Sequence, residues 1–105
     1  GAVNGSIVSV DDEDKQIPDS FHLYQNYPNP FNPSTQISFD LPQSSFTRLT
    51  VYDMLGRKVS SLVNEKLVAG SYSYRWEASN YSSGFYIYRL EASGKVRTGK
   101  MLLIK

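Results

Sequence analysis

The sequence contains no cysteine, which excludes disulfide bonds and thiolate metal sites and leaves the redox compartment undetermined. It has no apolar run that approaches the roughly 18–20 residues of a membrane-spanning helix, and no N-terminal signal peptide is visible. The formal net charge is +1, so the chain has no strong overall attraction for nucleic acid or for a membrane surface. Because residues 1–2, Gly-Ala, are typical of an expression scar, we interpret the chain as a fragment of a longer protein.

Side chains that carry out catalysis or hold metals are scarce. The only histidine is His22, which no nucleophile motif accompanies, so we expect it to lie at the surface. Four consecutive acids at 11–14 lack the spaced carboxylates and the glycine of a calcium-binding loop. No glycine-rich phosphate loop is present, and Glu77 and Glu91 are isolated acids. The sequence therefore argues against an enzyme, a bound cofactor, a small-molecule substrate and a nucleic-acid partner.

The 105 residues are enough for one domain with a real core, since 40% of them are hydrophobic and 13% are aromatic. Eight are tyrosines, which suit half-buried sheet faces because the ring packs while the hydroxyl reaches water. Charge is uneven: the acids are consecutive at 11–14, whereas residues 95–105 contain four basic residues and no acid. We interpret residues 1–20 as a flexible linker with a candidate short strand at 6–10, and residues 21–105 as the folded domain.

Residues 25–35, here called the proline segment, contain three prolines and three asparagines within eight positions. Because proline lacks an N–H and fixes φ, the segment cannot lie inside a helix or a central strand, and we expect it to be stiff and rich in turns. Tyr27 and Phe31 are its large apolar side chains, and we predict that both pack against the edge of the domain.

After the proline segment, apolar and polar residues alternate in a way typical of half-buried strands. Asp53 and Gly56 predict a tight turn, residues 64–69 a longer connection, and Ser93-Gly94 a hairpin turn. No segment carries a sustained helical period, so the pattern predicts an all-β fold, a small antiparallel immunoglobulin-like β-sandwich of about seven strands. Six strands are expected at 35–41, 46–52, 57–63, 71–76, 84–90 and 96–104, with 6–10 as the candidate seventh.

Tyr72, Tyr74 and Trp76 lie on one face of the predicted strand 71–76 and form an aromatic stripe. One interpretation is a flat surface on which sugar rings stack, which requires an exposed Trp76. The other interpretation, which we favour, places this single tryptophan in the core, where large aromatic side chains are highly buried on average.

The last predicted strand, 96–104, is a candidate interaction element. A strand at the end of a chain is peeled from a sheet edge more easily than an internal one, and its backbone groups then pair with a receptor by β-addition. Residues 101–104 supply apolar side chains, and Lys100 and Lys105 supply flanking charge. The alternative is an ordinary strand that closes the sheet.

Five motifs occur in order and resemble those of the type A C-terminal sorting domain of the type IX secretion system, found on secreted and surface proteins of Bacteroidota. The resemblance covers about residues 21–105, and the immunoglobulin-like domain of flagellar hook-capping proteins is a neighbouring family. The motifs are Tyr27-Pro28-Asn29-Pro30-Phe31-Asn32-Pro33, Val51-Tyr52-Asp53-Met54-Leu55-Gly56-Arg57, Ala69-Gly70-Ser71-Tyr72, Ser83-Gly84-Phe85-Tyr86 and Lys100-Met101-Leu102-Leu103-Ile104-Lys105.

The resemblance implies a secretion signal rather than a catalyst. Such a domain follows a covalently attached cargo protein, passes through the periplasm, and directs the cargo through an outer-membrane translocon to the cell surface or the medium. A cell-surface sortase then removes the domain, which would place cleavage within residues 1–20. The resemblance assigns family-motif roles to Tyr27, Pro28, Asn29, Pro30, Phe31, Asn32, Pro33, Tyr52, Asp53, Gly56, Arg57, Gly70, Tyr72, Gly84 and Tyr86.

Within this interpretation, the translocon is expected to recognise the basic and apolar end of the last strand. The residues predicted for recognition are Lys100, Met101, Leu102, Leu103, Ile104 and Lys105. The alternative functions are a carbohydrate-binding module and a structural immunoglobulin-like accessory module of a multidomain secreted enzyme.

Overall fold

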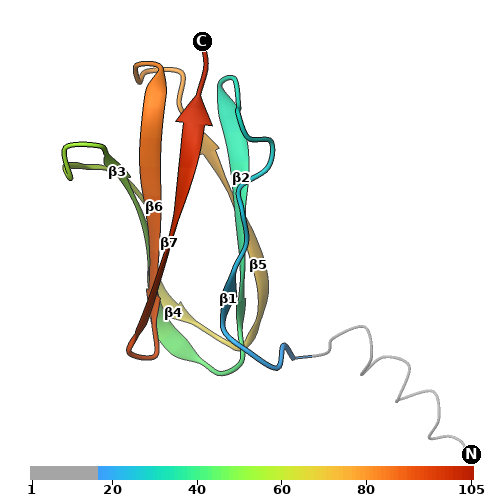
Figure 1. Cartoon of the computed structure of the whole chain (residues 1–105). Coiled ribbons are helices and arrows are strands. Elements are labelled where there is room, and N and C mark those ends of the chain that lie inside the picture. Colours follow the sequence, from blue (N-terminus) through green and yellow to red (C-terminus); the bar gives the residue numbers. More distant parts are fainter. Residues whose placement is uncertain (1–16) are drawn as a thin grey trace, which may run out of the picture.

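The computed structural model describes residues 17–105. The candidate strand at 6–10, the acids at 11–14 and most of the predicted linker 1–20 lie outside the described residues. Within residues 17–105 the chain forms seven strands in two antiparallel sheets that pack face to face (Figure 1), which confirms the predicted all-β sandwich. The strands are β1 (His22–Leu23), β2 (Ser34–Leu41), β3 (Ser45–Asp53), β4 (Lys58–Leu67), β5 (Gly70–Glu77), β6 (Gly84–Ala92) and β7 (Lys95–Leu103).

The topology is that of an immunoglobulin-like sandwich. One sheet has the order β1-β2-β5, and the other has the order β4-β3-β6-β7. The chain crosses between the sheets after β2, β4 and β5, so that β2 pairs with β5 and β3 pairs with β6. Such crossovers between two packed antiparallel sheets are typical of this fold class. They leave β7 at one edge of the four-stranded sheet, where the candidate recognition residues lie.

The core forms between the sheets by alternation along each strand. On β2, Ile37, Phe39 and Leu41 are buried while the residues between them are not fully buried. On β6, which lies between β3 and β7, Tyr86 and Tyr88 point into the same core. Inside the described part of the chain, no helix is long and apolar enough to cross a membrane.

Trp76 on β5 is only 2% exposed, which confirms its predicted place in the core. Its neighbours in the aromatic stripe, Tyr72 and Tyr74, stack on Phe39 with ring centroids 5.5 and 5.9 Å away. The interpretation of the stripe as a sugar-stacking surface is therefore wrong, because the indole that it requires faces inward.

The turns follow the predictions with one correction. The hairpin at Ser93-Gly94 is confirmed, and the φ angles of 53° and 75° are those of a type I′ turn. The expected long connection at 64–69 is wrong, because β4 continues to Leu67 and leaves two residues before β5. β4 extends to Leu67 because it pairs with β3 along nearly its whole length. The pairing is interrupted by two register shifts, between Leu49 and Thr50 and between Val51 and Tyr52.

Candidate functional site along strand β7

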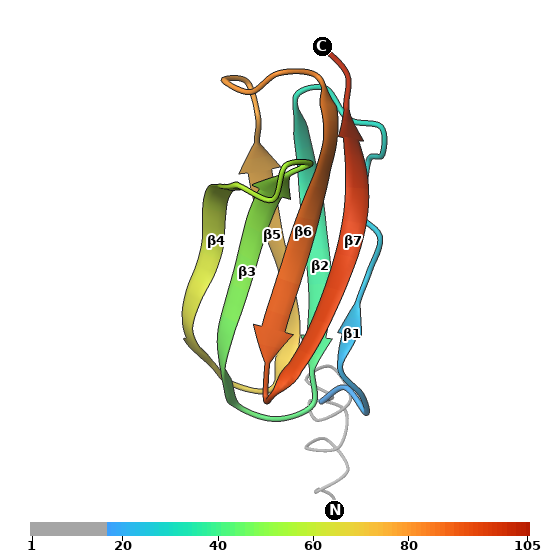
Figure 2. The same cartoon turned by 60° about the vertical axis from the view of Figure 1, so that its left-hand side comes forward.

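The proline segment passes from one sheet to the other. Tyr27 pairs with Gln36 of β2 through two backbone hydrogen bonds of 3.0 and 2.9 Å, and Phe31 then forms a parallel bridge with Leu103 of β7. Figure 2 shows the segment rising beside β7 after it leaves β1. Prolines suit this position, because the chain bends between sheets and needs few N–H donors on its outer side.

The segment closes the outer edge of β7 between residues 100 and 104. Four hydrogen bonds reach this edge, and three use the backbone or side chain of residues 29 and 31. The bonds run from Phe31 N–H to Leu102 O at 3.0 Å, from Ile104 N–H to Phe31 O at 2.9 Å, from Leu102 N–H to Asn29 Oδ1 at 3.0 Å, and from Gln25 Nε2 to Lys100 O at 3.0 Å. Since an open edge strand is a template for further pairing, the proline segment already occupies the position that a β-addition partner would take.

Phe31 anchors the proline segment in the core. Its side chain is 2% exposed, and its ring lies 5.8 Å from the ring of Trp76, which in turn contacts Tyr86 at 5.3 Å. The prediction that Phe31 packs against the domain is confirmed. The same prediction is wrong for Tyr27, which is 79% exposed because its backbone pairs with β2 while its ring points away from the core.

A buried polar network forms the second anchor. The N–H of Asn26 donates to the hydroxyl of Tyr88 at 3.0 Å, and that hydroxyl donates to the carbonyl of Tyr24 at 3.0 Å. The Asn26 side chain donates to Thr35 Oγ1 at 2.9 Å and to the carbonyl of Pro28 at 3.1 Å. Burial raises the pKa of Tyr88 above its ordinary value of 10.0, so the hydroxyl stays neutral and serves as both donor and acceptor.

Sequence reasoning missed Asn26 and Tyr88, and it also missed Gly99 on β7. A Cβ at Gly99 would overlap Cζ and the hydroxyl of Tyr88, so the ring fits only because position 99 has no side chain. A signal for this contact was present, since a glycine inside a strand often marks the close approach of another group.

The six predicted recognition residues fall into two sets. Met101 and Leu103 are buried in the core, whereas Lys100, Leu102, Ile104 and Lys105 are at least partly exposed. A partner that binds the folded domain would therefore contact only the second set.

The two lysines of this set are held differently. The ammonium group of Lys100 lies 4.8 Å from the ring centroid of exposed Phe85. The ammonium group of Lys105 instead donates to the carbonyls of Ser79 and Tyr81 in the β5–β6 connection. The ammonium group of Lys100 is thus exposed beside an aromatic ring. The ammonium group of Lys105 binds the C-terminal end of the chain to the β5–β6 connection.

The motif between β3 and β4 is a loop built on Asp53. Its carboxylate accepts the N–H groups of Leu55 and Arg57, each at 2.9 Å, and Oδ2 lies 2.8 Å from Nε of Arg57. Gly56 takes a φ of 86°, as the predicted tight turn requires. These contacts explain why Asp53, Gly56 and Arg57 occur together, and Tyr52 precedes them as a half-buried residue at the end of β3.

The Asp53 loop should make stability depend on acid. The N–H of Arg57 is the main reason that the pKa of Asp53 lies below its ordinary value of 3.8. A carboxyl group with a lowered folded-state pKa stabilises the fold above its unfolded-state pKa, and this stabilisation is lost as the pH falls through the folded-state pKa. We expect the unfolding free energy of wild type, measured in urea between pH 6 and pH 2, to fall more steeply than that of Asp53→Asn. The asparagine keeps one acceptor oxygen but has no charge to lose, and parallel curves would contradict the prediction.

The glycines and tyrosines of the remaining two motifs form the same local structure twice. Each motif has the pattern Gly-x-Tyr at the start of a strand, and each tyrosine hydroxyl donates to the carbonyl four residues before it. Tyr72 reaches Val68 O and Tyr86 reaches Ser82 O, both at 2.6 Å. Gly70 and Gly84 adopt φ angles of 155° and 147°. The contact of Tyr86 with Ser82, at the start of β6, is the tyrosine corner of immunoglobulin-like sandwiches. The glycines and tyrosines of these two motifs therefore have structural roles.

No cluster of metal-ligating side chains accompanies this site in the part of the chain that the structure covers. Among residues 17–105, no three histidine, cysteine, aspartate or glutamate side chains are close enough together to hold a metal ion. What the site displays in the folded domain is a covered strand edge with at least partly exposed side chains at Lys100, Leu102 and Ile104.

Comparison with known proteins gives the family and the structural neighbours of the chain. The family described as the secretion system C-terminal sorting domain matches residues 25–105. No curated protein sequence matches the chain. Two solved structures from Porphyromonas gingivalis share the fold: PorZ, described as an essential bacterial surface component of the type IX secretion system, and dimeric latent PorU.

The two structures are similar to this chain over a small part of their own length. PorZ is 19% identical, with a TM-score of 0.56 over 79% of this chain and 11% of its own. PorU is 21% identical, with a TM-score of 0.61 over 85% of this chain and 10% of its own. The chain therefore spans about a tenth of either structure.

Proposed function

Because the chain belongs to the family of secretion system C-terminal sorting domains, we propose that it is the sorting signal of a protein exported by the type IX secretion system. The protein that carries it is then secreted or displayed at the cell surface. The observation that carries the proposal is the family match over residues 25–105, which includes the proline segment and β7. The domain acts as an address and has no catalytic role of its own.

The domain is joined to its cargo through residues 1–20, which serve as a linker. The partners are the outer-membrane translocon, a cell-surface sortase that cleaves within this linker, and the covalently attached cargo. The near-neutral net charge of the chain favours a protein partner over nucleic acid. The order of the motifs favours the protein partners of this family.

The translocon recognises the folded domain by binding the exposed side chains at the end of β7. Three of these, Lys100, Leu102 and Ile104, lie where the proline segment already pairs with the strand edge. A partner that recognised the bare backbone would first have to break four hydrogen bonds and withdraw Phe31 from the core. Recognition of exposed side chains needs neither step, and it leaves Met101 and Leu103 in their structural places.

An export assay with matched double variants tests this proposal. The full chain is fused behind a periplasm-targeted fluorescent reporter in a host that has the type IX system, and the reporter in the medium and at the surface is measured. Lys100→Ser with Ile104→Ser should lower export by about tenfold, which corresponds to a loss of about 1.4 kcal/mol in recognition. Lys95→Ser with Val96→Ser should leave export at the wild-type level.

The control pair is chosen for composition and exposure. Each pair removes one lysine and one β-branched residue from the same part of the chain, and Val96 and Ile104 are 44% and 47% exposed. Deleting residues 100–105 would be less informative, because it also removes two core side chains. Equal export of the two variants would contradict recognition at 100–104, and a wild-type fusion retained in the periplasm would favour a structural spacer domain.

A further inference from the structure

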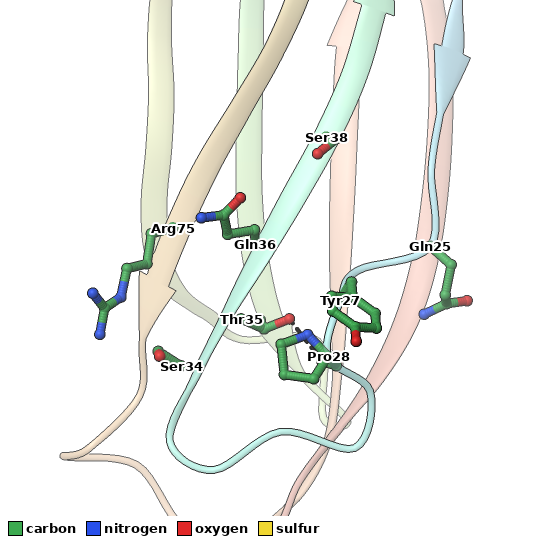
Figure 3. A pocket seen from close by; sticks show the side chains of 8 residues that line it. All are labelled: Gln25, Tyr27, Pro28, Ser34, Thr35, Gln36, Ser38 and Arg75. Carbon is green, nitrogen blue, oxygen red and sulfur yellow. Dashed lines mark hydrogen bonds between the residues drawn. The ribbon is translucent and has the colours of Figure 1, made fainter.

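A groove lies beside the proline segment, and the proposed export function assigns no role to it. It has a volume of about 620 Å³ and lies on the outer face of the three-stranded sheet, between the proline segment and strands β2 and β5 (Figure 3). Its lining includes Tyr27 and Pro28 on one side and Ser34, Gln36, Ser38 and Arg75 across the sheet. One wall of the groove is therefore formed by the proline motif of the family. The groove lies on the sheet of β2 and β5, whereas the residues proposed for translocon recognition lie on the other sheet.

Tyr27 presents a large ring to solvent from a fixed backbone. The ring is 79% exposed, yet the residue is held by two backbone hydrogen bonds to Gln36. Beneath it, the buried hydroxyl of Thr35 donates to the carbonyl of Pro28 at 2.8 Å, the contact drawn in Figure 3. A rigidly mounted, exposed aromatic ring is a stacking surface that loses little conformational entropy when a ligand binds.

The polar side chains of the groove are ordered and carry no net charge. Gln36 accepts a hydrogen bond from Ser73 Oγ at 2.9 Å, and Ser38 donates to the same hydroxyl at 3.1 Å. Arg75 is paired with Glu77 at 2.9 Å, which neutralises its charge. Among residues 17–105, the side-chain nitrogen Nε2 of Gln36 takes part in no hydrogen bond, and the guanidinium of Arg75 has no partner other than Glu77. Both groups keep donors that a ligand can use.

We propose that this groove binds a neutral saccharide, with one sugar ring stacked on Tyr27 and its hydroxyl groups bonded to Gln36 and Arg75. The polar lining disfavours an apolar ligand, and the paired Arg75 disfavours an anion. Strand β2 is already paired with β5 on one side and with the proline segment on the other, so an extended peptide finds no free backbone at the groove floor. A saccharide needs only the stacking surface and the donors that are present.

The test uses the full chain with defined probes. Cellohexaose, mannohexaose, xylohexaose and chitohexaose are titrated into the ¹⁵N-labelled protein, and amide chemical shifts report the affinity and the site. At least one probe should shift the resonances of residues 27, 36 and 75, and Tyr27→Ala should weaken its binding by at least tenfold. The control Phe46→Ala removes another exposed aromatic ring, 53% exposed and on the other sheet, and should bind as wild type does.

Three results would overturn the proposal. The first is no chemical-shift change with any of the four neutral probes, and the second is chemical-shift changes that lie outside the groove. The third is tight binding of dextran sulfate, an anionic polysaccharide titrated in the same way, without binding of the neutral probes. Because Tyr27 is exposed, its alanine variant should fold as wild type does, which a thermal melt checks. Saccharide binding and export are separate measurements, so a failure here leaves the secretion proposal unaffected, and a failure of export leaves this one unaffected.

Discussion

Replacing Phe31 with alanine should lower the free energy of unfolding by about 3–5 kcal/mol, the usual cost of deleting a buried phenylalanine ring. The ring is 2% exposed and contacts Trp76, so its removal leaves a cavity in the aromatic cluster that Trp76, Tyr81 and Tyr86 form. It is also the side chain that holds the proline segment against β7. Unfolding in urea, followed by tryptophan fluorescence, measures the effect directly because Trp76 is the only tryptophan.

Tyr27→Ala is the matched control for this prediction. It removes an aromatic ring from the same segment, four residues earlier, but the ring is exposed, so the change in unfolding free energy should stay within about 0.5 kcal/mol. Equal destabilisation by the two variants would contradict the assignment of Phe31 as the anchor.

Loss of the anchor should also be visible at individual amides. The N–H groups of Leu102 and Ile104 are bonded to Asn29 and Phe31, so they should exchange with solvent faster in Phe31→Ala than in wild type. The N–H of Met101, on the side of β7 that pairs with β6, should lose less protection. This difference would separate release of the segment from a general loss of stability.

Much of the fold could be predicted from sequence because strands such as β2 and β6 bury alternate side chains. Alternation placed β2 and β5 within a residue or two, and turn chemistry at Asp53 and Ser93-Gly94 located two connections. The end of β4 could not be predicted, since residues 64–67 are mostly polar and are held in the strand by pairing with β3. Periodicity reports burial, and an exposed strand end has no such pattern.

The candidate site was less predictable, because it depends on contacts between distant residues. Composition shows that the proline segment cannot be a central strand, but its transfer between sheets depends on Tyr27 meeting Gln36 and Phe31 meeting Leu103. For the same reason, the sequence does not separate buried Phe31 from exposed Tyr27. The apolar residues 101–104 form an unbroken run in the sequence, so neither the burial of Met101 and Leu103 nor the covered edge of β7 could be predicted from it.

The contact between Gly99 and Tyr88 was predictable in principle. A two-residue turn at Ser93-Gly94 sets Ala92 opposite Lys95, and counting outward from the turn sets Tyr88 opposite Gly99, as the structure has it. An aromatic ring that covers a glycine on the neighbouring strand is a recognised device for fixing register. Here the Tyr88 hydroxyl also accepts the N–H of Asn26 and donates to the carbonyl of Tyr24, so the pair joins the β6–β7 hairpin to the proline segment.

Gly99→Ala should therefore destabilise the domain by about 2–4 kcal/mol, the sum of overpacking and of the hydrogen bonds lost when the Tyr88 ring moves. The new Cβ would overlap the end of the Tyr88 ring, which is 1% exposed, so the ring would have to shift and its hydroxyl would leave its hydrogen-bond partners. The backbone at Gly99 does not have a positive φ, so alanine is compatible with it. Without the ring, the substitution would be expected to stabilise by about 0.4–1 kcal/mol through the unfolded state.

The sign of the Gly99→Ala effect thus depends on Tyr88, and a double-mutant cycle measures that dependence. Tyr88→Leu removes the part of the ring that meets the Cβ, and in this background Gly99→Ala should become neutral or stabilising. The unfolding free energies of the four proteins in urea give the coupling energy. If Gly99→Ala costs the same in both backgrounds, the ring is not the reason for the glycine. A sign reversal would show that Gly99 is needed because Tyr88, with its bonds to Asn26 and Tyr24, holds the proline segment in place on the domain.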